Sequence, residues 1–486
     1  MTGQEFNHDW QTHKSNNFKK IGQLKHVTSD SIKNSGVSIG FECLDRFLFD
    51  PEKCYDKLAA IGVKWARCQT GWCRCEKEKN VYDFRWLDTV VDNLLKRGIQ
   101  PWFNLGYGNK LYMPDAYGDA AVGHVPLYYG DEALQAWEKY VAALAEHFSD
   151  RVNFWEIWNE PNVKSFWQPM EPSPMDYAKL IRITAPIIRN YVPGAKIGAC
   201  QNCVFSPSYT PAFIKSGIAD TIDIFSVHIY RIQPESKNVY NELETLRRML
   251  DENGGSHVKI YQGESGYASW FPENHWMNTY FLESETNQAK WLLRRFLSDF
   301  GAGLELSCFF QVADMEKPYQ KGFDEIKLPA RYGILNGNNY TPKKSYYALA
   351  HIATVFDCDT KRLPSYINIS SDVDMPKSER LSRLFNVSFM THSFIRNNRP
   401  MYFYYLPEDI QLDWPGLSNM DISLFPAEHN TGISNPVAVD MLDGSIYKIE
   451  NFETTGEYVS QLRGMPIKDY PILITDINAL AGRIEN

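Results

Sequence analysis

Three things are missing from this sequence of 486 residues, and each absence removes a class of protein. No run of about 18 apolar residues occurs, which argues against a helix that crosses a membrane. No basic cluster offsets the excess of 59 acidic over 50 basic side chains, so the net charge of −9 argues against a nucleic-acid partner. The cysteine count of nine is odd, which argues against a fully paired disulfide framework.

The N-terminal residues 1–20 also lack the apolar segment of a signal peptide. We therefore expect a cytoplasmic protein, or a secreted or periplasmic one if a leader has been removed. Two close cysteine pairs, Cys73 with Cys75 and Cys200 with Cys203, suggest zinc, but the pairs lie far apart in sequence and no histidine stands between their members. We expect mostly buried, reduced thiols, no metal and no cofactor.

The composition is that of a globular protein. Hydrophobic residues make up 44 % and charged residues 22 %, which provides ample apolar surface for a large core. Aromatic residues are abundant, with 13 Trp, 28 Tyr and 27 Phe. Aromatic rings fill cores, and they also stack on flat apolar faces of ligands.

Residues 36–357 alternate between short β-branched or aromatic runs and longer stretches with helical periodicity, such as Tyr82–Arg97. This alternation repeats eight times at roughly 40-residue intervals, which predicts an α/β fold in which a parallel sheet closes into a (β/α)8 TIM barrel. A doubly wound sheet is the alternative, but it rarely needs eight units. The expected strands are Val37–Phe41, Val63–Arg67, Ile99–Asn104, Val152–Trp158, Ala195–Ala199, Ile222–Val227, Val258–Gly263 and Leu304–Phe310.

The pattern changes in residues 358–486, where helical periodicity gives way to short strand-like runs separated by Gly, Pro, Asn and Asp. We expect a C-terminal β-sandwich accessory domain there. The polar residues 1–35 are expected to form an N-terminal arm or an additional strand of that sandwich. The clearest expected strands are Arg383–Phe389, Pro400–Leu406, Val437–Asp440 and Ile472–Thr475.

The strongest chemical signal is the sequence Phe-Trp-Glu-Ile-Trp-Asn-Glu-Pro-Asn at 154–162, at the end of the fourth expected strand. Asn159 and Glu160 emerge at the C-terminal rim of a barrel, where active sites form, and Pro161 prevents further strand pairing. The flanking tryptophans create a semi-apolar setting, which we expect to raise the pKa of Glu160 toward the value that a general acid needs.

A second carboxylate, Glu264, ends the seventh expected strand. The fourth and seventh strands face each other across a barrel, so Glu160 and Glu264 can point into one cleft. Two opposed carboxylates are what hydrolysis of a glycosidic bond requires. The glycines Gly263 and Gly266 on either side are expected to let a substrate approach the backbone.

The Trp-Glu-Ile-Trp-Asn-Glu-Pro-Asn motif, followed by Phe166-Trp167, resembles the retaining glycosidases of glycoside hydrolase clan A. Within the clan, the chain is most similar to glycoside hydrolase family 39, which includes β-xylosidases and α-L-iduronidases. The resemblance implies that Glu160 is the proton donor and that Glu264 is the nucleophile.

The same resemblance assigns supporting roles to four further side chains. Arg67, in Trp-Ala-Arg at the second strand, and Asn159 match the residues that orient the nucleophile and the sugar 2-hydroxyl in the clan. His228 and Tyr230 match the His-x-Tyr sequence that closes the sixth strand, in which the tyrosine bonds the nucleophile.

The expected function is therefore a retaining hydrolase that acts on an oligo- or polysaccharide by double displacement. Long loops at 105–130 and 267–281 are able to wall the cleft into a pocket, which favours exo action. The alternatives are an endo-acting hydrolase or transglycosylase on the same scaffold, and a non-catalytic carbohydrate-binding protein. Carbohydrate is the expected partner, and assembly into homo-oligomers is left open.

Trp167 and Trp270 are expected to contact the sugar, with Trp72, Tyr107, Trp158, Phe271 and Trp276 as further stacking candidates.

Overall fold

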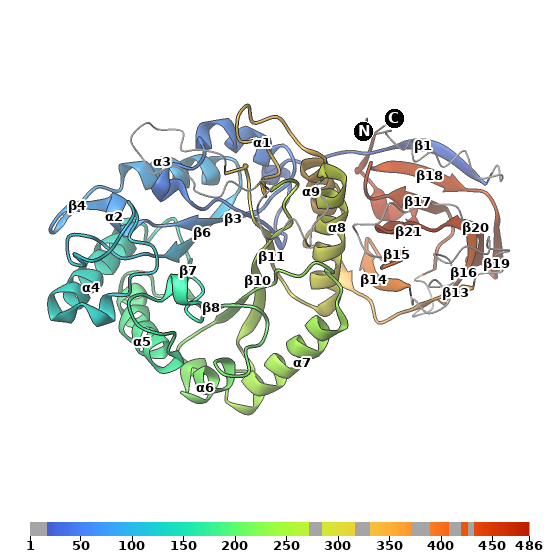
Figure 1. Ribbon diagram of the computed structural model, residues 1–486. Coiled ribbons are helices and arrows are strands. Elements are labelled where there is room, and N and C mark those ends of the chain that lie inside the picture. The colour runs from blue at the N-terminus through green and yellow to red at the C-terminus, as the bar shows by residue number, and fades with distance from the viewer. Residues whose placement is uncertain are drawn as a thin grey trace.

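The computed structural model describes residues 17–271, 284–315, 331–370, 389–407, 419–425 and 432–485. A barrel and a pair of antiparallel sheets lie side by side (Figure 1). Within these ranges, none of the helices is both long and apolar enough to cross a membrane. Trp276 and, apart from its last residue, the expected strand at 383–389 lie outside the described residues.

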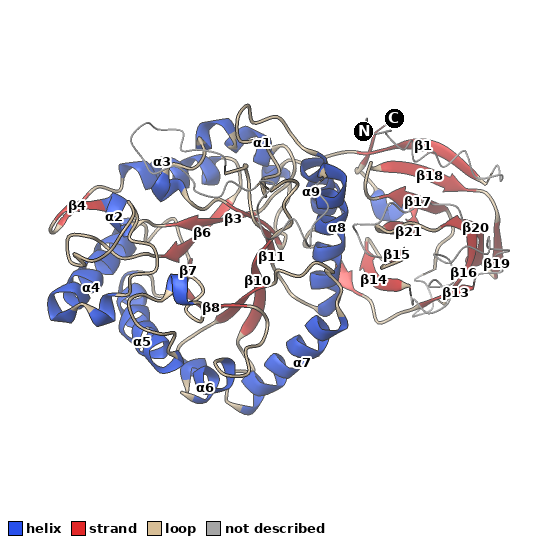
Figure 2. Ribbon diagram, viewed as in Figure 1, coloured by secondary structure: helices blue, strands red, loops and turns tan. Residues whose placement is uncertain are grey.

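Eight parallel strands form the barrel, and each of the eight predicted strands overlaps one of them. Their bounds are β2 (Val37–Gly40), β3 (Trp65–Gln69), β6 (Gln100–Leu105), β7 (Phe154–Ile157), β8 (Lys196–Asn202), β9 (Ile224–His228), β10 (Lys259–Ser265) and β11 (Ser307–Phe309). The barrel closes in the order β10-β11-β2-β3-β6-β7-β8-β9, and Figure 2 shows the helices around these strands. The predicted (β/α)8 barrel is confirmed.

The helices begin and end where local chemistry favours it. Ser173 caps one helix through the N–H of Asp176, and Pro174 occupies its first turn. Another ends at Gly303, whose φ of 90° suits only glycine well. The helices are α1 (Tyr55–Ala59), α2 (Trp72–Cys75), α3 (Arg85–Lys96), α4 (Gly130–His147), α5 (Pro174–Tyr191), α6 (Thr210–Lys215), α7 (Lys237–Glu252), α8 (Glu285–Ala302) and α9 (Lys344–Val355), and a short hairpin joins β4 (Glu76–Glu78) to β5 (Val81–Tyr82).

The antiparallel part consists of two sheets, as expected for a sandwich. The strands are β1 (Phe18–Leu24), β12 (Lys361–Arg362), β13 (Ile367–Ser370), β14 (Met390–Arg396), β15 (Arg399–Tyr405), β16 (Asn419–Leu424), β17 (Pro436–Asp440), β18 (Ser445–Ile449), β19 (Phe452–Thr455), β20 (Tyr458–Pro466), β21 (Ile472–Asp476) and β22 (Ile484–Glu485). The larger sheet has the order β12-β14-β15-β21-β17-β18-β1-β22, and the smaller has β13-β16-β20-β19. β1 precedes the barrel in sequence, yet it pairs with β18 and β22 in the larger sheet.

The larger sheet is covered on both faces. Along β15, Met401, Phe403 and Tyr405 belong to the apolar cluster that continues into the barrel. The alternate residues Tyr402 and Tyr404 belong to the cluster between the two sheets. Because successive side chains of a strand point to opposite faces, a strand buried on both sides must be apolar throughout. This explains the continuous run Pro-Met-Tyr-Phe-Tyr-Tyr-Leu in the sequence.

Candidate active site

Glu160 and Asn159 both turn into the mouth of the barrel because the backbone leaves the strand conformation after β7. Trp158 and Glu160 have positive φ angles of 70° and 43°. In an extended strand, consecutive side chains would point to opposite faces, and these left-handed residues break that alternation. Cys200 of β8 stabilises the turn, since its Sγ lies 3.3 Å from both the Glu160 amide nitrogen and the Trp158 carbonyl oxygen.

Glu264 is presented by an irregularity near the end of β10, where the pairing with β9 shifts between Gln262 and Glu264. A Cβ on Gly263 would collide with the Ser226 hydroxyl, and one on Gly266 would collide with the carbonyl of Phe310. The two glycines therefore allow neighbouring strands to fit together. The expectation that they open space for a substrate is not supported, because other protein atoms already fill that space.

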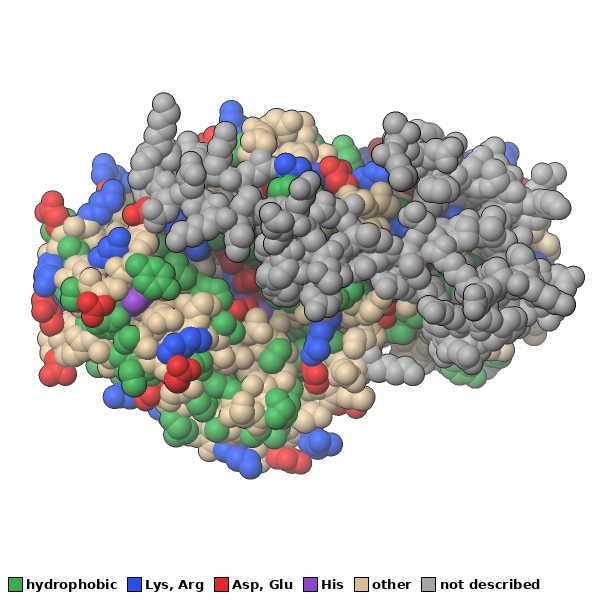
Figure 3. Space-filling view, in the orientation of Figure 1, with side chains coloured by type: hydrophobic (Ala, Val, Ile, Leu, Met, Phe, Trp, Pro, Cys, Tyr) green, Lys and Arg blue, Asp and Glu red, His purple; other side chains and the backbone are tan. Residues whose placement is uncertain are grey.

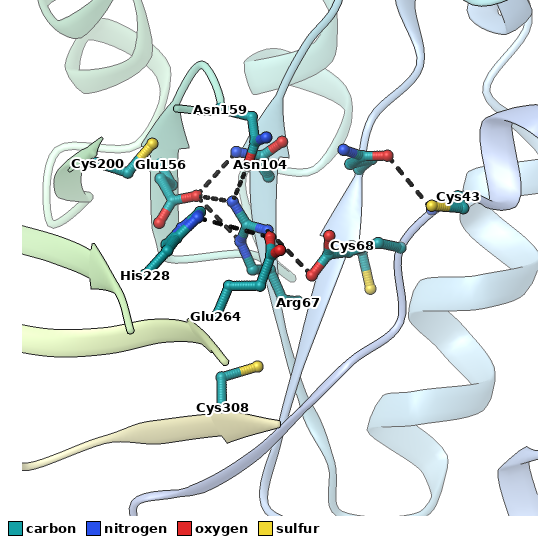
Figure 4. Close-up of polar contacts among 12 residues, drawn as sticks. Cys43, Arg67, Cys68, Asn104, Glu156, Asn159, Cys200, His228, Glu264 and Cys308 are labelled. Atoms are coloured by element: carbon teal, nitrogen blue, oxygen red, sulfur yellow. Dashed lines mark hydrogen bonds and ion pairs between the residues drawn. The ribbon is translucent and has the colours of Figure 1, made fainter. Parts of the chain in front are cut away.

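Arg67 of β3 is the fully buried centre of the site (Figure 4). Its Nη1 donates to Glu264 Oε2 over 2.8 Å, and its Nη2 donates to Asn159 Oδ1 over 2.8 Å. Its Nε bonds Glu156 Oε1 over 3.0 Å, and Glu42 Oε1 lies 3.0 Å from Nη1. One guanidinium thus holds three carboxylates and an amide that come from distant parts of the sequence.

Glu42 and Glu156 were not among the predicted site residues. Glu156 lies within β7, where Asn104 donates to its Oε1 over 2.8 Å. The other residues of β7 are apolar, and a single carboxylate among them is the sequence signal that could have identified Glu156. Glu42 follows β2 and gives no such signal. Burial raises the pKa of Glu42 to about 8, although the charge of Arg67 opposes the rise.

Glu160 is paired with a histidine, and this pairing reverses the expected direction of its pKa. Glu160 Oε1 accepts hydrogen bonds from His228 Nδ1 over 2.8 Å and from Asn202 Nδ2 over 2.9 Å. Burial raises the pKa of Glu160, but the hydrogen bond and positive charge of His228 lower it by more than burial raises it. The pKa of Glu160 therefore lies below its usual value. The predicted rise was wrong because it considered the tryptophans and not this partner.

His228 responds in the opposite sense. Burial lowers its pKa, but the charge of Glu264 and the hydrogen bond to Glu160 raise it more, so that the pKa of His228 lies above the usual value. The pair therefore favours a proton on the imidazole and a negative charge on Glu160.

Tyr230, in the loop after β9, completes the contacts of Glu264. Its hydroxyl donates to Glu264 Oε1 over 2.7 Å, while Arg67 holds Oε2. Burial and the Glu264 charge raise the pKa of Tyr230 well above its usual value, so the phenol remains a hydrogen-bond donor at neutral pH.

The two carboxylates meet. One oxygen of Glu160 and one of Glu264 lie within 4.8 Å of each other, and both residues are at least nine-tenths buried. Retaining glycosidases hold their carboxyl groups about 5–5.5 Å apart, against about 6.5–9.5 Å in inverting enzymes. Figure 3 shows acidic and histidine side chains at the bottom of a hollow in the barrel face.

Two groups of side chains among the described residues are close enough to bind a metal ion: Glu160, His228 and Glu264, and Glu156, Cys200 and His228. Neither group fits a resident metal well. Arg67 already neutralises Glu156 and Glu264. Burial raises the pKa of the Cys200 thiol, which disfavours the thiolate that a metal would need.

The two predicted sugar-contacting tryptophans differ in exposure. Trp167 is fully buried, its indole N–H donates to the Tyr128 hydroxyl over 2.9 Å, and its ring packs against Trp158. It has no face on which a sugar could stack, so the structure places it in the core. Trp270 is partly exposed, and the Arg331 guanidinium lies 4.7 Å from its ring centre. The other candidates Trp72, Tyr107, Trp158 and Phe271 are also buried.

Tyr332 is an aromatic residue near the site that the sequence did not single out. Its ring meets that of Tyr230 edge to face, with 6.3 Å between the ring centres, and it also contacts Phe271 and Phe310. These rings form a wall beside Glu264.

Among curated proteins, the chain is similar to a β-xylosidase of Geobacillus stearothermophilus, with 28 % identity over 193 residues, 36 % of this chain and 37 % of the relative. A β-xylosidase of Caldicellulosiruptor saccharolyticus is 26 % identical over 200 residues, 37 % of this chain and 38 % of the relative. The matched region thus spans less than two fifths of the length of either relative.

Solved structures share the fold over more of the chain. A family 39 glycoside hydrolase from Bacteroides cellulosilyticus aligns with a TM-score of 0.61 and 17 % identity, over 91 % of this chain and 80 % of that one. A β-xylosidase from Caulobacter crescentus aligns with a TM-score of 0.55 and 13 % identity, over 94 % and 97 %. The sequence profile of Glycosyl hydrolases family 39 matches residues 59–350, which is more than half of the chain. The chain therefore belongs to glycosyl hydrolase family 39.

Proposed function

We propose that this protein is a retaining glycoside hydrolase that acts by double displacement, with Glu264 as nucleophile and Glu160 as acid and base. The observation that carries the proposal is the approach of their carboxylate oxygens to within 4.8 Å. Family membership supports the reaction class. The different partners of the two carboxylates support the division of roles.

In the first step, a Glu264 oxygen attacks the anomeric carbon, the glycosidic C–O bond breaks, and Glu160 gives a proton to the leaving oxygen. Arg67 and Tyr230 each hold one oxygen of Glu264, which fixes the carboxylate for attack. In the second step, Glu160 removes a proton from water as the water displaces Glu264, and the sugar leaves with its original anomeric configuration.

Glu160 must carry a proton to act as the acid, but the lowered pKa of Glu160 and the raised pKa of His228 favour that proton on His228. The hydrogen bond of 2.8 Å between His228 Nδ1 and Glu160 Oε1 provides the route by which the imidazole passes this proton to the carboxylate. Activity should therefore decline as the pH rises through the pKa of His228, which lies above the usual histidine value.

We propose a β-xyloside at a chain end as the substrate, because the two curated relatives named above are β-xylosidases. The partly exposed Trp270 is proposed to contact the sugar. Aryl β-D-xyloside is the first compound to test in a panel of aryl glycosides. Digestion of a xylo-oligosaccharide should release xylose first. Initial products that are longer than xylose but shorter than the substrate would establish an endo-acting enzyme. Products longer than the substrate would establish a transglycosylase.

The decisive experiment removes each carboxylate in turn. Glu264→Ala should abolish turnover, and added azide should restore it with an inverted glycosyl azide as product. Glu160→Ala should retain activity on aryl glycosides with good leaving groups and lose it on oligosaccharides, because only the latter need protonation of the leaving oxygen. NMR of the wild-type reaction should show the retained anomer first.

Glu132→Ala is the matched control, because its side chain lies in the first turn of α4, is exposed, and pairs with the exposed Lys79. It should leave kcat unchanged. Near wild-type activity of both Glu264→Ala and Glu160→Ala would contradict the assignment. Tight sugar binding by the wild-type protein without hydrolysis would instead identify a non-catalytic carbohydrate-binding protein.

A further inference from the structure

The loop between β9 and α7, residues 229–236, positions Glu264 at two points. The Tyr230 hydroxyl bonds the Glu264 side chain over 2.7 Å, and the Ile229 amide donates to the Glu264 backbone carbonyl over 3.0 Å. Any displacement of this loop therefore moves or releases the carboxylate. What holds the loop in place consequently matters for the reaction.

Arg294 of α8 holds the loop from outside the barrel. This residue is fully buried, its Nε donates to Glu235 Oε2 over 3.1 Å, and its Nη2 donates to Gln233 Oε1 over 3.0 Å. The planar guanidinium thereby ties two side chains of the loop in a fixed relation, which a single ammonium group cannot do. The same helix adds two bonds to the loop backbone: Trp291 Nε1 to the Arg231 carbonyl and Arg295 Nη1 to the Pro234 carbonyl.

α8 is in turn held by the sandwich, next to which it stands in Figure 1. Lys290 Nζ pairs with Asp469 Oδ2 over 2.7 Å, and Arg294 Nη1 donates to the Asp469 carbonyl over 3.3 Å. The Arg294 guanidinium also lies 5.5 Å from the ring centre of Tyr405 in β15. All four side chains are at least nine-tenths buried, so water screens these contacts little.

We propose that the sandwich is a brace for the active site, acting from Asp469 through Arg294 to the 229–236 loop and so to Glu264. Arg294 is the positioning residue of this brace. Among the described residues, its hydrogen bonds join the loop and the sandwich, and neither Glu160 nor Glu264 is one of their partners. The proposal rests on the proposed function, because it concerns how Glu264 is held for attack.

A second buried ion pair joins the same two regions at the other end of the barrel and supplies the control. Asp357 Oδ2 lies 3.0 Å from Arg396 Nη2 of β14, and both side chains are nearly fully buried. Asp357 follows the C-terminus of α9, whereas the 229–236 loop follows the C-terminus of a strand. Since helices and strands of a (β/α)8 barrel run in opposite directions, the two sites lie at opposite ends.

The experiment compares Arg294→Lys and the paired variant Arg294→Gln/Glu235→Gln with Arg396→Lys and Asp357→Asn/Arg396→Gln. Three quantities are measured on the full chain: hydrogen exchange of residues 229–236, kcat and KM on an aryl glycoside, and the thermal unfolding midpoint. The two Lys variants keep the positive charge, and they take the place of a paired variant that fails to fold.

The Arg294 variants should speed hydrogen exchange in residues 229–236 and lower kcat on the order of 10- to 100-fold, with a smaller change in KM, because a misplaced group slows the chemical step. The Arg396 variants should lower the unfolding midpoint and leave kcat unchanged. In a Tyr230→Phe background, the Arg294 substitution should cost much less activity than alone, since both act on Glu264.

Unchanged exchange in the loop, or an equal loss of kcat in the Arg294 and Arg396 variants, would overturn the brace. If the loss of kcat caused by the Arg294 substitution were as large in the Tyr230→Phe background as alone, the path through the loop would be overturned. If the wild-type protein hydrolyses no glycoside, the proposed function fails, whereas hydrogen exchange still decides whether Arg294 holds the loop.

Discussion

The barrel centre and strand β15 of the sandwich are equally buried, but they are built from opposite materials. Around Arg67, the barrel encloses the four carboxyl groups of Glu42, Glu156, Glu160 and Glu264. Along β15, both faces carry apolar and aromatic side chains. Burying charge is costly unless it is paired and hydrogen-bonded, so the barrel centre is arranged for chemistry and β15 for stability.

The difference shows where each region is vulnerable. In the barrel, one guanidinium compensates several carboxylates at once, so a single substitution there affects all of them. In the sandwich, stability is distributed over many contacts, each of which is separately small.

Replacing Arg67 with Met should have the largest effect, because it leaves several buried carboxylates without their cation. We expect a loss of kcat of at least 10²–10³-fold and a loss of about 3–5 kcal/mol in the free energy of unfolding. Aryl glycoside kinetics and urea unfolding measure the two. Arg67→Lys, which keeps the charge without the planar fork, should recover stability better than activity. Activity within tenfold of the wild type in Arg67→Met would refute the central role of this residue.

Replacing Phe403 with Ala breaks the apolar side of the comparison. Phe403 is fully buried in β15 on the face toward the barrel. The cavity should cost about 3–5 kcal/mol of unfolding free energy, measured by urea denaturation. Phe403→Leu, which fills most of the volume, should cost less. At temperatures where both variants are folded, kcat should stay near the wild-type value, because the Phe403 ring packs on Phe356 and Phe394, whereas Tyr405 is the β15 residue beside Arg294. A parallel fall of kcat with stability would show that the brace is not confined to the contacts of Arg294.

Glu42→Gln tests the raised pKa of Glu42 through the pH dependence of the free energy of unfolding. The folded protein holds a proton on Glu42 between the usual pKa of 4.5 and the raised value of about 8, and the unfolded chain releases it. Folding therefore becomes less favourable as the pH rises through this window, and a glutamine removes this contribution.

The Glu42→Gln variant and the wild type should have similar stability at pH 5, and the variant should be the more stable at pH 9. Denaturant unfolding at both pH values measures the difference. A stability gap between the two proteins that does not change with pH would contradict a raised pKa at Glu42.

The smallest effect on stability is expected from loss of a single hydroxyl, and two tyrosines form a matched pair. Tyr404 in β15 donates to the Pro466 carbonyl over 2.9 Å, whereas Tyr230 donates to Glu264. Tyr404→Phe should cost about 1 kcal/mol of unfolding free energy and leave kcat unchanged. Tyr230→Phe should mainly lower kcat. If Tyr404→Phe lowered kcat as much as Tyr230→Phe does, the two regions would not be functionally distinct.

Much of the fold could be predicted because it depends on local patterns. Each barrel strand produces a short apolar run, and the longer surrounding helices, such as α3, produce a period of 3.6 residues, so the repeated alternation can be recognised from the sequence alone. Glu160 was identifiable because Asn-Glu-Pro directly follows a buried strand, and Glu264 because it ends the seventh.

Other site residues could not be predicted, because nothing in their local sequence distinguishes them. Glu42 and Asn202 are single polar residues whose importance arises from the atoms that the closed barrel brings beside them. Cys200 is conspicuous in the sequence only through its spacing to Cys203, which does not indicate its contact with the Glu160 amide. Trp167 has the composition of a sugar-binding residue, yet its ring is enclosed by other aromatics. Burial depends on the whole chain and cannot be deduced from one motif.

The sequence by itself determined the order of strands and helices and the chemical groups that the strand ends carry, because periodicity and residue type are local properties. The tertiary structure alone decided which groups share Arg67, that His228 keeps the pKa of Glu160 low, and that α8 joins the sandwich to the 229–236 loop. The physical reason is that charge interactions and burial depend on distances of a few ångströms between residues far apart in the chain.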